Sequence, residues 1–217
     1  MKIHRFFTDS DLVAIREATT EAETRTGGEI VPYIVERVIE KDRASWRGAA
    51  IGALAAALAA GIFNVFSQSW GGSGIWWITL PAVAGSGLGF LIGGMDAVSR
   101  WLIPDDEVDH AVRVRAEAAF VEEEVFDTRD RTGILVFLSL SEHRAVILAD
   151  VGINRSVPEG TWQELVDELV AGIRAGRAAE AMRNTVRRCG EVLVEHGVAL
   201  RPDDTDELPD APRIRER

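Results

Sequence analysis

The sequence predicts an α/β sheet domain that is interrupted by a two-helix transmembrane hairpin. Three observations carry this prediction. The stretch from Gly48 to Met95 contains no charged side chain, although 27% of the chain is Asp, Glu, Lys or Arg. Helical and strand patterns alternate on both sides of that stretch. The remainder is long enough for one domain with a hydrophobic core of its own.

Composition divides the chain into four segments. Residues 1–39 are the first part of the sheet domain, and residues 40–104 are the hairpin with its flanks. Residues 105–198 are the second part of the domain. Residues 199–217 combine charge with three prolines and almost no apolar side chains, so we expect a disordered tail there.

The first part of the domain contains one helix and one strand. Residues 9–26 have helical periodicity, and Thr8 stands before them as an N-cap with Asp11 in the capping-box position. Residues 29–38 are rich in Ile and Val and predict a strand. Pro32 interrupts this strand, which favours a place at the edge of the sheet or at a bulge.

The charge-free stretch consists of two apolar pieces, about Gly48 to Phe66 and about Ile75 to Met95, joined by a polar, glycine-rich segment at 67–74. A membrane-spanning helix needs roughly 20 apolar residues, and each piece supplies about that many. Tryptophans gather near the ends of the pieces, as amphipathic rings do at a membrane interface. They are Trp46, Trp70, Trp76, Trp77 and Trp101. The alternative interpretation is a buried helical pair in a soluble protein.

Small residues recur every four positions in both pieces, which allows two helix backbones to approach closely. They are Ala53, Ala57 and Gly61 in the first piece and Gly85, Gly89 and Gly93 in the second. Because the connection is short, we expect these rows to pack against each other within the hairpin. A homo-oligomer formed through Gly85, Gly89 and Gly93 is the second interpretation.

Basic residues predict the orientation of the hairpin. Lys41, Arg43 and Arg47 precede the first piece, Arg100 follows the second, and the connecting loop has none. Both flanks are therefore predicted to face the cytoplasm. This describes a multi-pass protein of the inner (plasma) membrane with two spans, whose termini and soluble domain are cytoplasmic. The spans lack the ionisable side chains that an ion or proton pathway usually needs.

The second part of the domain begins with a predicted helix at 105–124. The nearly continuous apolar run at 133–140 is typical of a strand covered on both faces, and residues 144–149 are predicted to pair with it as a hairpin at the centre of the sheet. Two amphipathic helices follow at 161–174 and 178–196.

Charge and cysteine content exclude several classes of function. The net charge of −11 opposes binding to nucleic acids or to anionic lipid surfaces, both of which require basic patches. The single cysteine, Cys189, excludes an internal disulfide and a cysteine-based zinc cluster. It lies on an apolar helix face and is interpreted as a small buried hydrophobe.

Four short motifs resemble the TPM-domain family, in particular its bacterial membrane-associated branch. The first is TGGEI at 26–30, after an amphipathic helix, and the second is TRDRTGILV at 128–136, opening a buried strand. The third is DVGI at 150–153, and the fourth is Trp162 at the start of the next helix. The similarity covers both soluble parts and leaves out the hairpin and the tail.

The resemblance implies an α/β/α sandwich around a small mixed sheet. Plant members of the family are linked to acid phosphatase activity and photosystem repair, some members bind divalent metal at acidic residues, and animal members assist membrane receptors. Thr132 departs from the pattern, since many relatives have Asn before the glycine of the buried strand. The predicted cytoplasmic location also differs from that of relatives associated with phosphatase activity.

Acidic side chains near the predicted strand ends are candidate ligands for a hard cation, Ca²⁺ or Mg²⁺, which prefers oxygen ligands. They are Asp127, Asp130, Asp150 and Glu29. Arg131 and Trp162 are the candidate binding residues, Arg131 as a partner of a carboxylate or a phosphate. In the competing interpretation Asp127 and Asp130 are turn residues, Asp150 caps a loop, and Arg131 neutralises them.

Two functions remain open. The first is a membrane-anchored module whose cytoplasmic domain binds a membrane-protein partner in the assembly or maintenance of a membrane complex. The alternative is a divalent-metal-dependent phosphatase of the acid-phosphatase type, which uses the acidic loops. The sequence contains no complete set of catalytic residues, so the first hypothesis is preferred.

Overall fold

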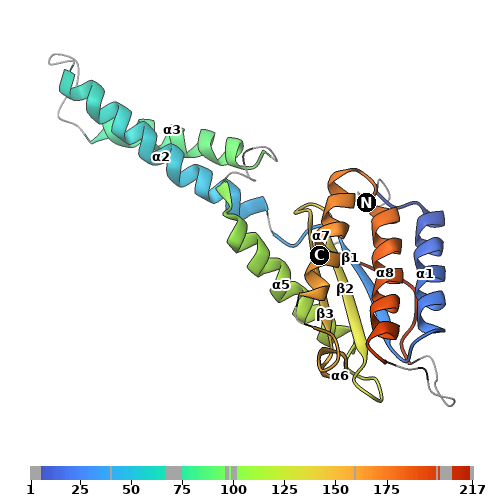
Figure 1. Cartoon of the computed structure of the whole chain (residues 1–217). Helices are drawn as coiled ribbons and strands as arrows, with labels where there is room; N and C mark the ends of the chain where they lie inside the picture. The colour runs from blue at the N-terminus through green and yellow to red at the C-terminus, as the bar shows by residue number, and fades with distance from the viewer. Residues whose placement is uncertain are drawn as a thin grey trace. The chain divides into compact units, whose positions relative to one another are not determined.

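The computed structural model describes residues 6–39, 41–66, 75–95, 98, 102–158, 160–198, 200 and 207–215 (Figure 1). The chain divides into two compact units. One comprises Met1–Val38 and Asp109–Arg217, and the other comprises Ile39–Val108. The predicted connecting loop at 67–74, which includes Trp70, and the flanking residues Arg100 and Trp101 lie outside the described residues.

The first unit is built on a four-stranded mixed sheet with the order β3-β2-β1-β4. The strands are β1 (Glu29–Val35), β2 (Gly133–Ser139), β3 (Arg144–Ala149) and β4 (Arg213–Arg215). β1 runs parallel to β2 and β4, whereas β2 and β3 are antiparallel. This confirms the predicted α/β class and the predicted β2–β3 hairpin.

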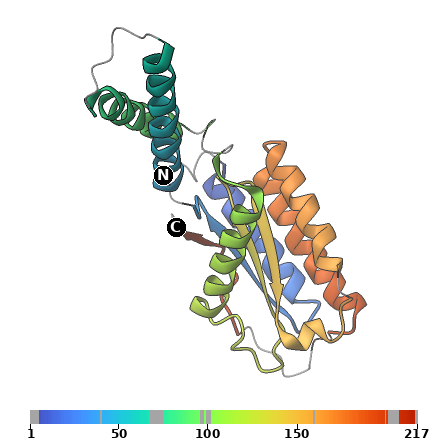
Figure 2. The ribbon, with the colours of Figure 1, turned by 90° about the vertical axis from the view of Figure 1, so that its left-hand side faces the viewer.

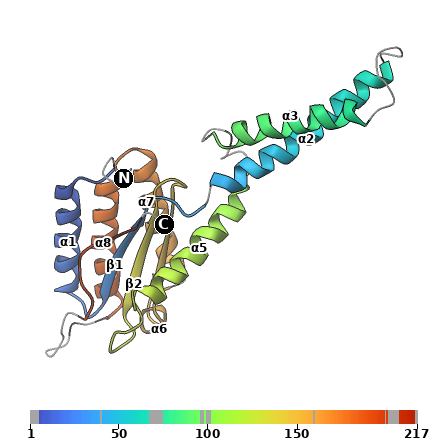
Figure 3. The same ribbon diagram turned by 180° about the vertical axis from the view of Figure 1, so that it is seen from behind.

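Helices cover both faces of this sheet (Figures 2 and 3). α1 (Asp9–Glu23), α7 (Thr161–Arg174) and α8 (Ala178–Glu195) lie on one face, and α5 (Asp105–Glu122) lies on the other. α6 (Val151–Asn154) is a single turn after β3. The main core lies between the sheet and the three-helix layer, where alternate strand residues point. It includes Ile15, Ile30, Ile34, Val136, Leu138, Leu169 and Val186, each at most 1% exposed.

The predicted capping box of α1 is present. The Thr8 side chain accepts from the Asp11 backbone N–H, and the Asp11 carboxylate accepts from the Thr8 backbone N–H at 2.8 Å. These contacts are local, so three residues of sequence were sufficient to predict them.

β1 as a whole is not the expected edge strand, because it lies between β2 and β4 and all seven of its residues are buried, but Pro32 itself lies in the part of β1 that the β4 pairing does not reach. The Glu29 N–H donates toward β2, to Thr132, and the Glu36 N–H donates toward β4, to Arg215. Alternation along the strand therefore turns the nitrogen of Pro32 toward β4. Pairing with β4 begins only at Tyr33, so the missing N–H of Pro32 costs the sheet no hydrogen bond.

The expected disorder of the tail is wrong for residues 207–215, which return to the sheet and supply β4. The Glu123 carboxylate on the segment after α5 binds both Arg213 and Arg215, at 3.0 and 3.1 Å. A three-residue strand held by backbone pairing and ion pairs needs few apolar side chains, which is why composition misled the prediction. Residues 201–206 lie outside the described residues.

The β2–β3 hairpin was expected at the centre of the sheet, and this is correct for β2 alone. β2 lies between β1 and β3, and its seven residues are all buried. β3 ends the strand order in the described part of the chain, with alternating buried and half-buried residues. Because β4 pairs with the other side of β1, the two central strands of the sheet are β2 and β1.

The second unit contains α2 (Lys41–Phe66) and α3 (Trp76–Gly93). By length and composition, Asp42–Phe66 and Trp76–Gly93 are candidate membrane spans, and only 6% of each apolar window is buried in the structure. Large apolar side chains such as Leu54, Ile62 and Leu80 are about 60% exposed or more. A core helix of a soluble protein would instead bury most of such residues.

α2 and α3 pack through glycines, as expected for a close helix pair, but through a different row of α2. A Cβ added to Gly85 would lie 2.4 Å from the Gly52 carbonyl oxygen, and one added to Gly89 would lie 2.1 Å from that of Gly48. The predicted row of Ala53, Ala57 and Gly61 is therefore wrong. Around Gly61 an added Cβ would meet nothing within 4 Å. A shift of one position turns a helix by about 100°, so the two rows face different directions.

Candidate functional site

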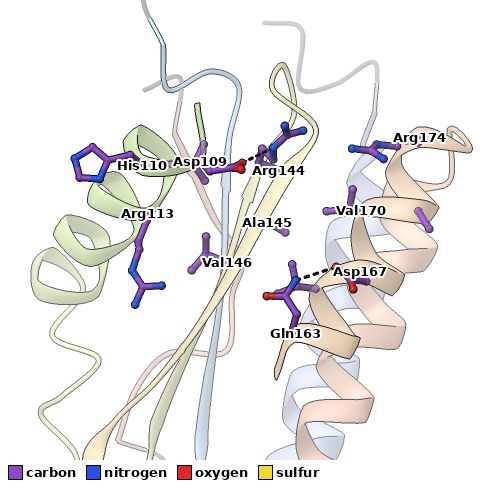
Figure 4. Close-up of a pocket in the computed structure, with 13 residues that line it drawn as sticks. Asp109, His110, Arg113, Arg144, Ala145, Val146, Gln163, Asp167, Val170 and Arg174 are labelled. Carbon is purple, nitrogen blue, oxygen red and sulfur yellow. Dashed lines mark hydrogen bonds and ion pairs between the residues drawn. The ribbon is translucent and has the colours of Figure 1, made fainter. Parts of the chain in front are cut away.

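A hollow in the sheet domain runs along β3, between α5 and α7 (Figure 4). We call it the β3 groove. Its volume is about 660 Å³, within the range of about 300–1,000 Å³ typical of ligand sites. Its lining residues are Asp109, His110, Val112 and Arg113 of α5, Arg144, Ala145 and Val146 of β3, and Gln163, Val166, Asp167, Val170, Ala171 and Arg174 of α7.

The outer edge of β3 carries backbone groups that face away from β2. The Asp150 N–H donates to the Gly133 carbonyl at 2.9 Å, which sets the alternation of the antiparallel ladder. Leu148, Val146 and Arg144 therefore bond toward β2, and the polar backbone groups of Ala145 and Ile147 point outward. The Asn154 side chain donates to the Ala149 carbonyl at 2.6 Å and closes the end of this edge.

Charged side chains form the rim of the groove. Arg144 of β3 pairs with Asp109 of α5 at 2.5 Å, and Gln163 donates to Asp167 within α7 at 2.9 Å (Figure 4). Arg113 pairs with Glu117, one turn further along α5. Arg174 lies in the last turn of α7, where a positive charge is favoured by the helix dipole. Between these groups, Val166 and Val170 provide apolar surface.

Sequence reasoning did not identify the β3 groove, because its residues come from three separate elements with no shared motif. Each element was predicted individually, but the groove exists only because β3 is at the end of the sheet. The half-buried valines of α7 at 166 and 170 were interpreted only as core positions. The strand order was the missing information.

The acidic loops proposed as a metal site do converge at one end of the sheet. Glu29 lies beside Gly133 in the parallel pair, and Asp150 lies beside Gly133 on the other side. This is the amino end of parallel strands β1 and β2, whereas ligands of open α/β sheets usually bind at the carboxyl ends. Within the described ranges, no group of three or more His, Cys, Asp or Glu side chains is arranged to hold a metal ion.

Asp150 is engaged in structural contacts. Its carboxylate binds Arg131 through two hydrogen bonds, at 2.5 and 3.0 Å, and accepts the Val151 N–H at 2.7 Å as N-cap of α6. The side chain is only 6% exposed. The hydrogen bonds that Arg131 donates to the Asp150 carboxylate raise the pKa of the Arg131 guanidinium above its ordinary value. The predicted pairing of Arg131 with a carboxylate is confirmed, as is the capping role of Asp150.

The loop before β2 is tied to α6 by this pair. Arg131 adopts a left-handed backbone with φ of 59°, which is uncommon for a residue other than glycine. The Gly152 N–H donates to the Arg131 carbonyl at 2.9 Å. A Cβ on Gly152 would lie 2.3 Å from the Asp130 carbonyl oxygen, so only glycine fits there.

The other candidate ligands differ in their surroundings. Glu29 is 8% exposed, and its carboxylate accepts the backbone N–H groups of Glu207 and Leu208 at 3.3 Å. Glu29 thus holds the returning tail segment. Asp127 and Asp130 are exposed in the turn that precedes β2. Of the four predicted ligands, Asp150 and Glu29 therefore use their carboxylates in contacts that stabilise the fold.

Trp162 and Thr132 have structural surroundings as well. Trp162 packs partly buried against the main core, and it does not line the β3 groove. The Thr132 hydroxyl donates to the Gly27 carbonyl at 2.8 Å, and the Thr132 N–H donates to the Thr128 hydroxyl at 2.9 Å. Thr132 therefore joins the loops at the amino ends of β1 and β2.

Cys189 is completely buried in α8, and burial raises the pKa of its thiol to about 12. The thiolate that nucleophilic chemistry needs is therefore not formed near neutral pH. This confirms the interpretation of Cys189 as a small buried hydrophobe.

One solved structure shares this fold. It is the NMR structure of the BA42 protein from the psychrophilic bacterium Bizionia argentinensis, with a TM-score of 0.59 and 18% sequence identity. The match covers 97% of this chain and 96% of the other. Comparisons with models of known protein families and with curated proteins yielded no match. At this identity the likeness supports the mixed α/β fold and nothing about activity.

Proposed function

We propose that this chain is a membrane-anchored interaction module, in which the α2–α3 hairpin lies in the inner (plasma) membrane and the sheet domain binds a membrane-protein partner in the cytoplasm. In this proposal the sheet domain is TPM-like. Its role is the assembly or maintenance of a membrane complex, without a chemical step of its own.

The observation that carries the proposal is the exposure of two adjoining apolar helices. Both windows are long enough to cross a bilayer, both are only 6% buried, and no charged residue occurs from Gly48 to Met95. Water solvates such a surface poorly, whereas hydrocarbon does not penalise it. The glycine contacts between α2 and α3 provide the close packing that holds helices together in lipid.

The β3 groove is the second support, because an interaction module needs an accessible binding surface. The metal-dependent phosphatase suggested by the family resemblance has less support. A cation bound by Asp150 would have to displace Arg131 and the Val151 N–H, and one bound by Glu29 would compete with the returning tail.

Single introduced cysteines test the membrane topology. The native Cys189 is 0% exposed with a raised pKa, so it leaves little background for a maleimide. Ser10→Cys places a thiol on the exposed surface of α1, and Ser69→Cys places one in the predicted external loop. In intact cells, a membrane-impermeant maleimide should label Ser69→Cys and should label Ser10→Cys only after lysis.

Alkaline carbonate washing of membranes provides the complementary measurement. The full-length protein should remain in the pellet and be released by detergent. Release by carbonate, or labelling of Ser10→Cys in intact cells, would contradict the proposed anchoring or its orientation. The variant chains must be produced at equal levels for the labelling comparison to hold.

A further inference from the structure

The β3 groove combines three properties on the same stretch of chain: outward-facing backbone groups, an apolar wall and a cluster of arginines. We propose that it binds an extended acidic segment of a partner protein, which adds to the sheet as a fifth strand beside β3. This inference rests on the proposed role as an interaction module and specifies the chemistry of the partner.

The backbone supplies the first argument. Ala145 and Ile147 direct their N–H and C=O groups away from β2, which is the template that strand addition uses. Asn154 closes the edge at Ala149, so the open portion begins where Ala145 lines the groove. Natural proteins usually block such edges against further pairing, and among the described residues Asn154 does so at Ala149.

The walls of the groove specify the side chains of the added strand. Successive side chains of a strand point to opposite faces of a sheet. On the three-helix face they would meet Val166 and Val170 of α7, and on the other face they would meet the part of α5 that carries Arg113. The segment that fits therefore alternates apolar residues with carboxylates.

Charge supplies the third argument. The groove holds three arginines and two aspartates, whereas the chain as a whole has a net charge of −11. Asp109 pairs with Arg144, Asp167 accepts from Gln163, and Arg113 pairs with Glu117, so the lining residues carry an excess of one positive charge. A basic surface on an acidic protein favours an acidic partner through complementary potentials. If two copies of the chain met through this groove, the arginines of one copy would face those of the other, which is unfavourable.

The test uses the full-length protein in lipid nanodiscs and a fluorescein-labelled ten-residue peptide of alternating valine and aspartate. Fluorescence anisotropy should show saturable binding that weakens as salt is raised. Arg113→Glu should weaken it about tenfold. Arg188→Glu, on the exposed side of α8 and outside the groove, is the matched control and should leave the affinity unchanged.

Three further measurements separate strand addition from simple charge attraction. Ala145→Pro removes an outward N–H without removing a bond to β2, so it should abolish peptide binding while the domain stays folded. Hydrogen exchange at Ala145 and Ile147 should slow about tenfold when the peptide is added. A peptide with N-methyl groups at alternate residues should not bind.

Three outcomes would each overturn the inference. They are equal binding of a valine–lysine peptide, unchanged hydrogen exchange at Ala145 and Ile147, and peptide binding that survives Ala145→Pro. So would a concentration-dependent dimer of the nanodisc-bound protein that is lost in Arg113→Glu. Failure of peptide binding with the predicted topology intact refutes only this inference. A hairpin that is released by carbonate refutes the proposed function itself.

Discussion

Gly89 of α3 lies so close to Gly48 of α2 that a Cβ added to Gly89 would stand 2.1 Å from the Gly48 carbonyl oxygen. This is a contact between backbones, which cannot be relieved by turning a side chain. The same relationship recurs one turn away between Gly85 and Gly52. The helix pair therefore depends on having no side chain at these positions.

Gly89→Leu should separate the two helices and destabilise the hairpin by about 1–3 kcal/mol or more, as overpacking does. Gly87→Leu is the matched control on the same helix, since an added Cβ there meets nothing within 4 Å. The thermal midpoint of the full-length protein in mild detergent, followed by tryptophan fluorescence, measures the difference. Equal midpoints for the two variants would refute the packing arrangement.

The same pair of variants bears on the predicted homo-oligomer. Gly85, Gly89 and Gly93 all face α2 within one chain in the structure. We therefore expect Gly89→Leu to leave the mass of the detergent-solubilised particle unchanged. A loss of dimer or higher oligomer in this variant alone, measured by light scattering, would instead assign these glycines to contacts between copies.

Asp150→Ala should destabilise the sheet domain, because it removes the N-cap of α6 and the partner of Arg131. Loss of the cap alone costs about 1 kcal/mol. Asp127→Ala changes an exposed residue of the same acidic group and should have little effect. Urea denaturation followed by circular dichroism provides the midpoints. A larger effect at Asp127 would contradict the structural assignment.

Chelation of divalent cations should leave the stability of the protein unchanged. Asp150 and Glu29 already accept hydrogen bonds from Arg131 and from the tail backbone, so a cation would have to displace them. The thermal midpoint should be the same in EDTA and in millimolar Ca²⁺ or Mg²⁺. A midpoint that rises with one cation and falls back in EDTA would restore the metal-site hypothesis.

Glu123→Gln should release β4 from the sheet, because one carboxylate binds both Arg213 and Arg215. Hydrogen exchange at residues 213–215 should accelerate about tenfold, while exchange in β2 stays slow. Glu117→Gln is the control, since this residue of α5 pairs with Arg113 on its exposed surface. Unchanged exchange at 213–215 would show that backbone pairing alone holds the strand.

The capping box of α1 should make stability depend on acid pH. Hydrogen bonds from the Thr8 backbone and side chain lower the pKa of Asp11 below its ordinary value of 3.8. A carboxyl group whose pKa is lower in the folded state than in the unfolded state stabilises the protein at pH values above its unfolded-state pKa. This stabilisation is lost as the pH falls through the folded-state pKa. Asp11→Asn should therefore destabilise the protein by about 0.3–1 kcal/mol at pH 7, as loss of an exposed negative charge in the first turn of a helix does.

At pH values below the lowered pKa, position 11 should contribute equally to the free energy of unfolding in Asp11→Asn and in the wild type. Asp9→Asn is the control, because Asp9 is also in the first turn of α1 but outside the capping box. Denaturation midpoints at pH 7 and at a series of pH values below 3.8 test both variants. A destabilisation by Asp11→Asn that does not shrink as the pH falls would refute the ionic role of the box.

Features that depend on neighbours in the sequence were predictable from the sequence by itself. The Thr8–Asp11 box requires contacts over three residues, and the periodicities of α7 and α8 follow from their own side chains. The charge-free run from Gly48 to Met95 and the pairing of β2 with β3 across a short turn are likewise local. In such cases the chain segment contains both interaction partners.

The tertiary structure alone decided which distant segments became neighbours. Pairing of β1 with β2 joins residues about a hundred positions apart, and β4 comes from a tail whose composition predicted disorder. That strand places β1 inside the sheet, and at the other side β3 ends the strand order of the described residues, where the β3 groove lies. Strand order depends on the summed free energy of long-range pairing and burial, and no local pattern contains that sum.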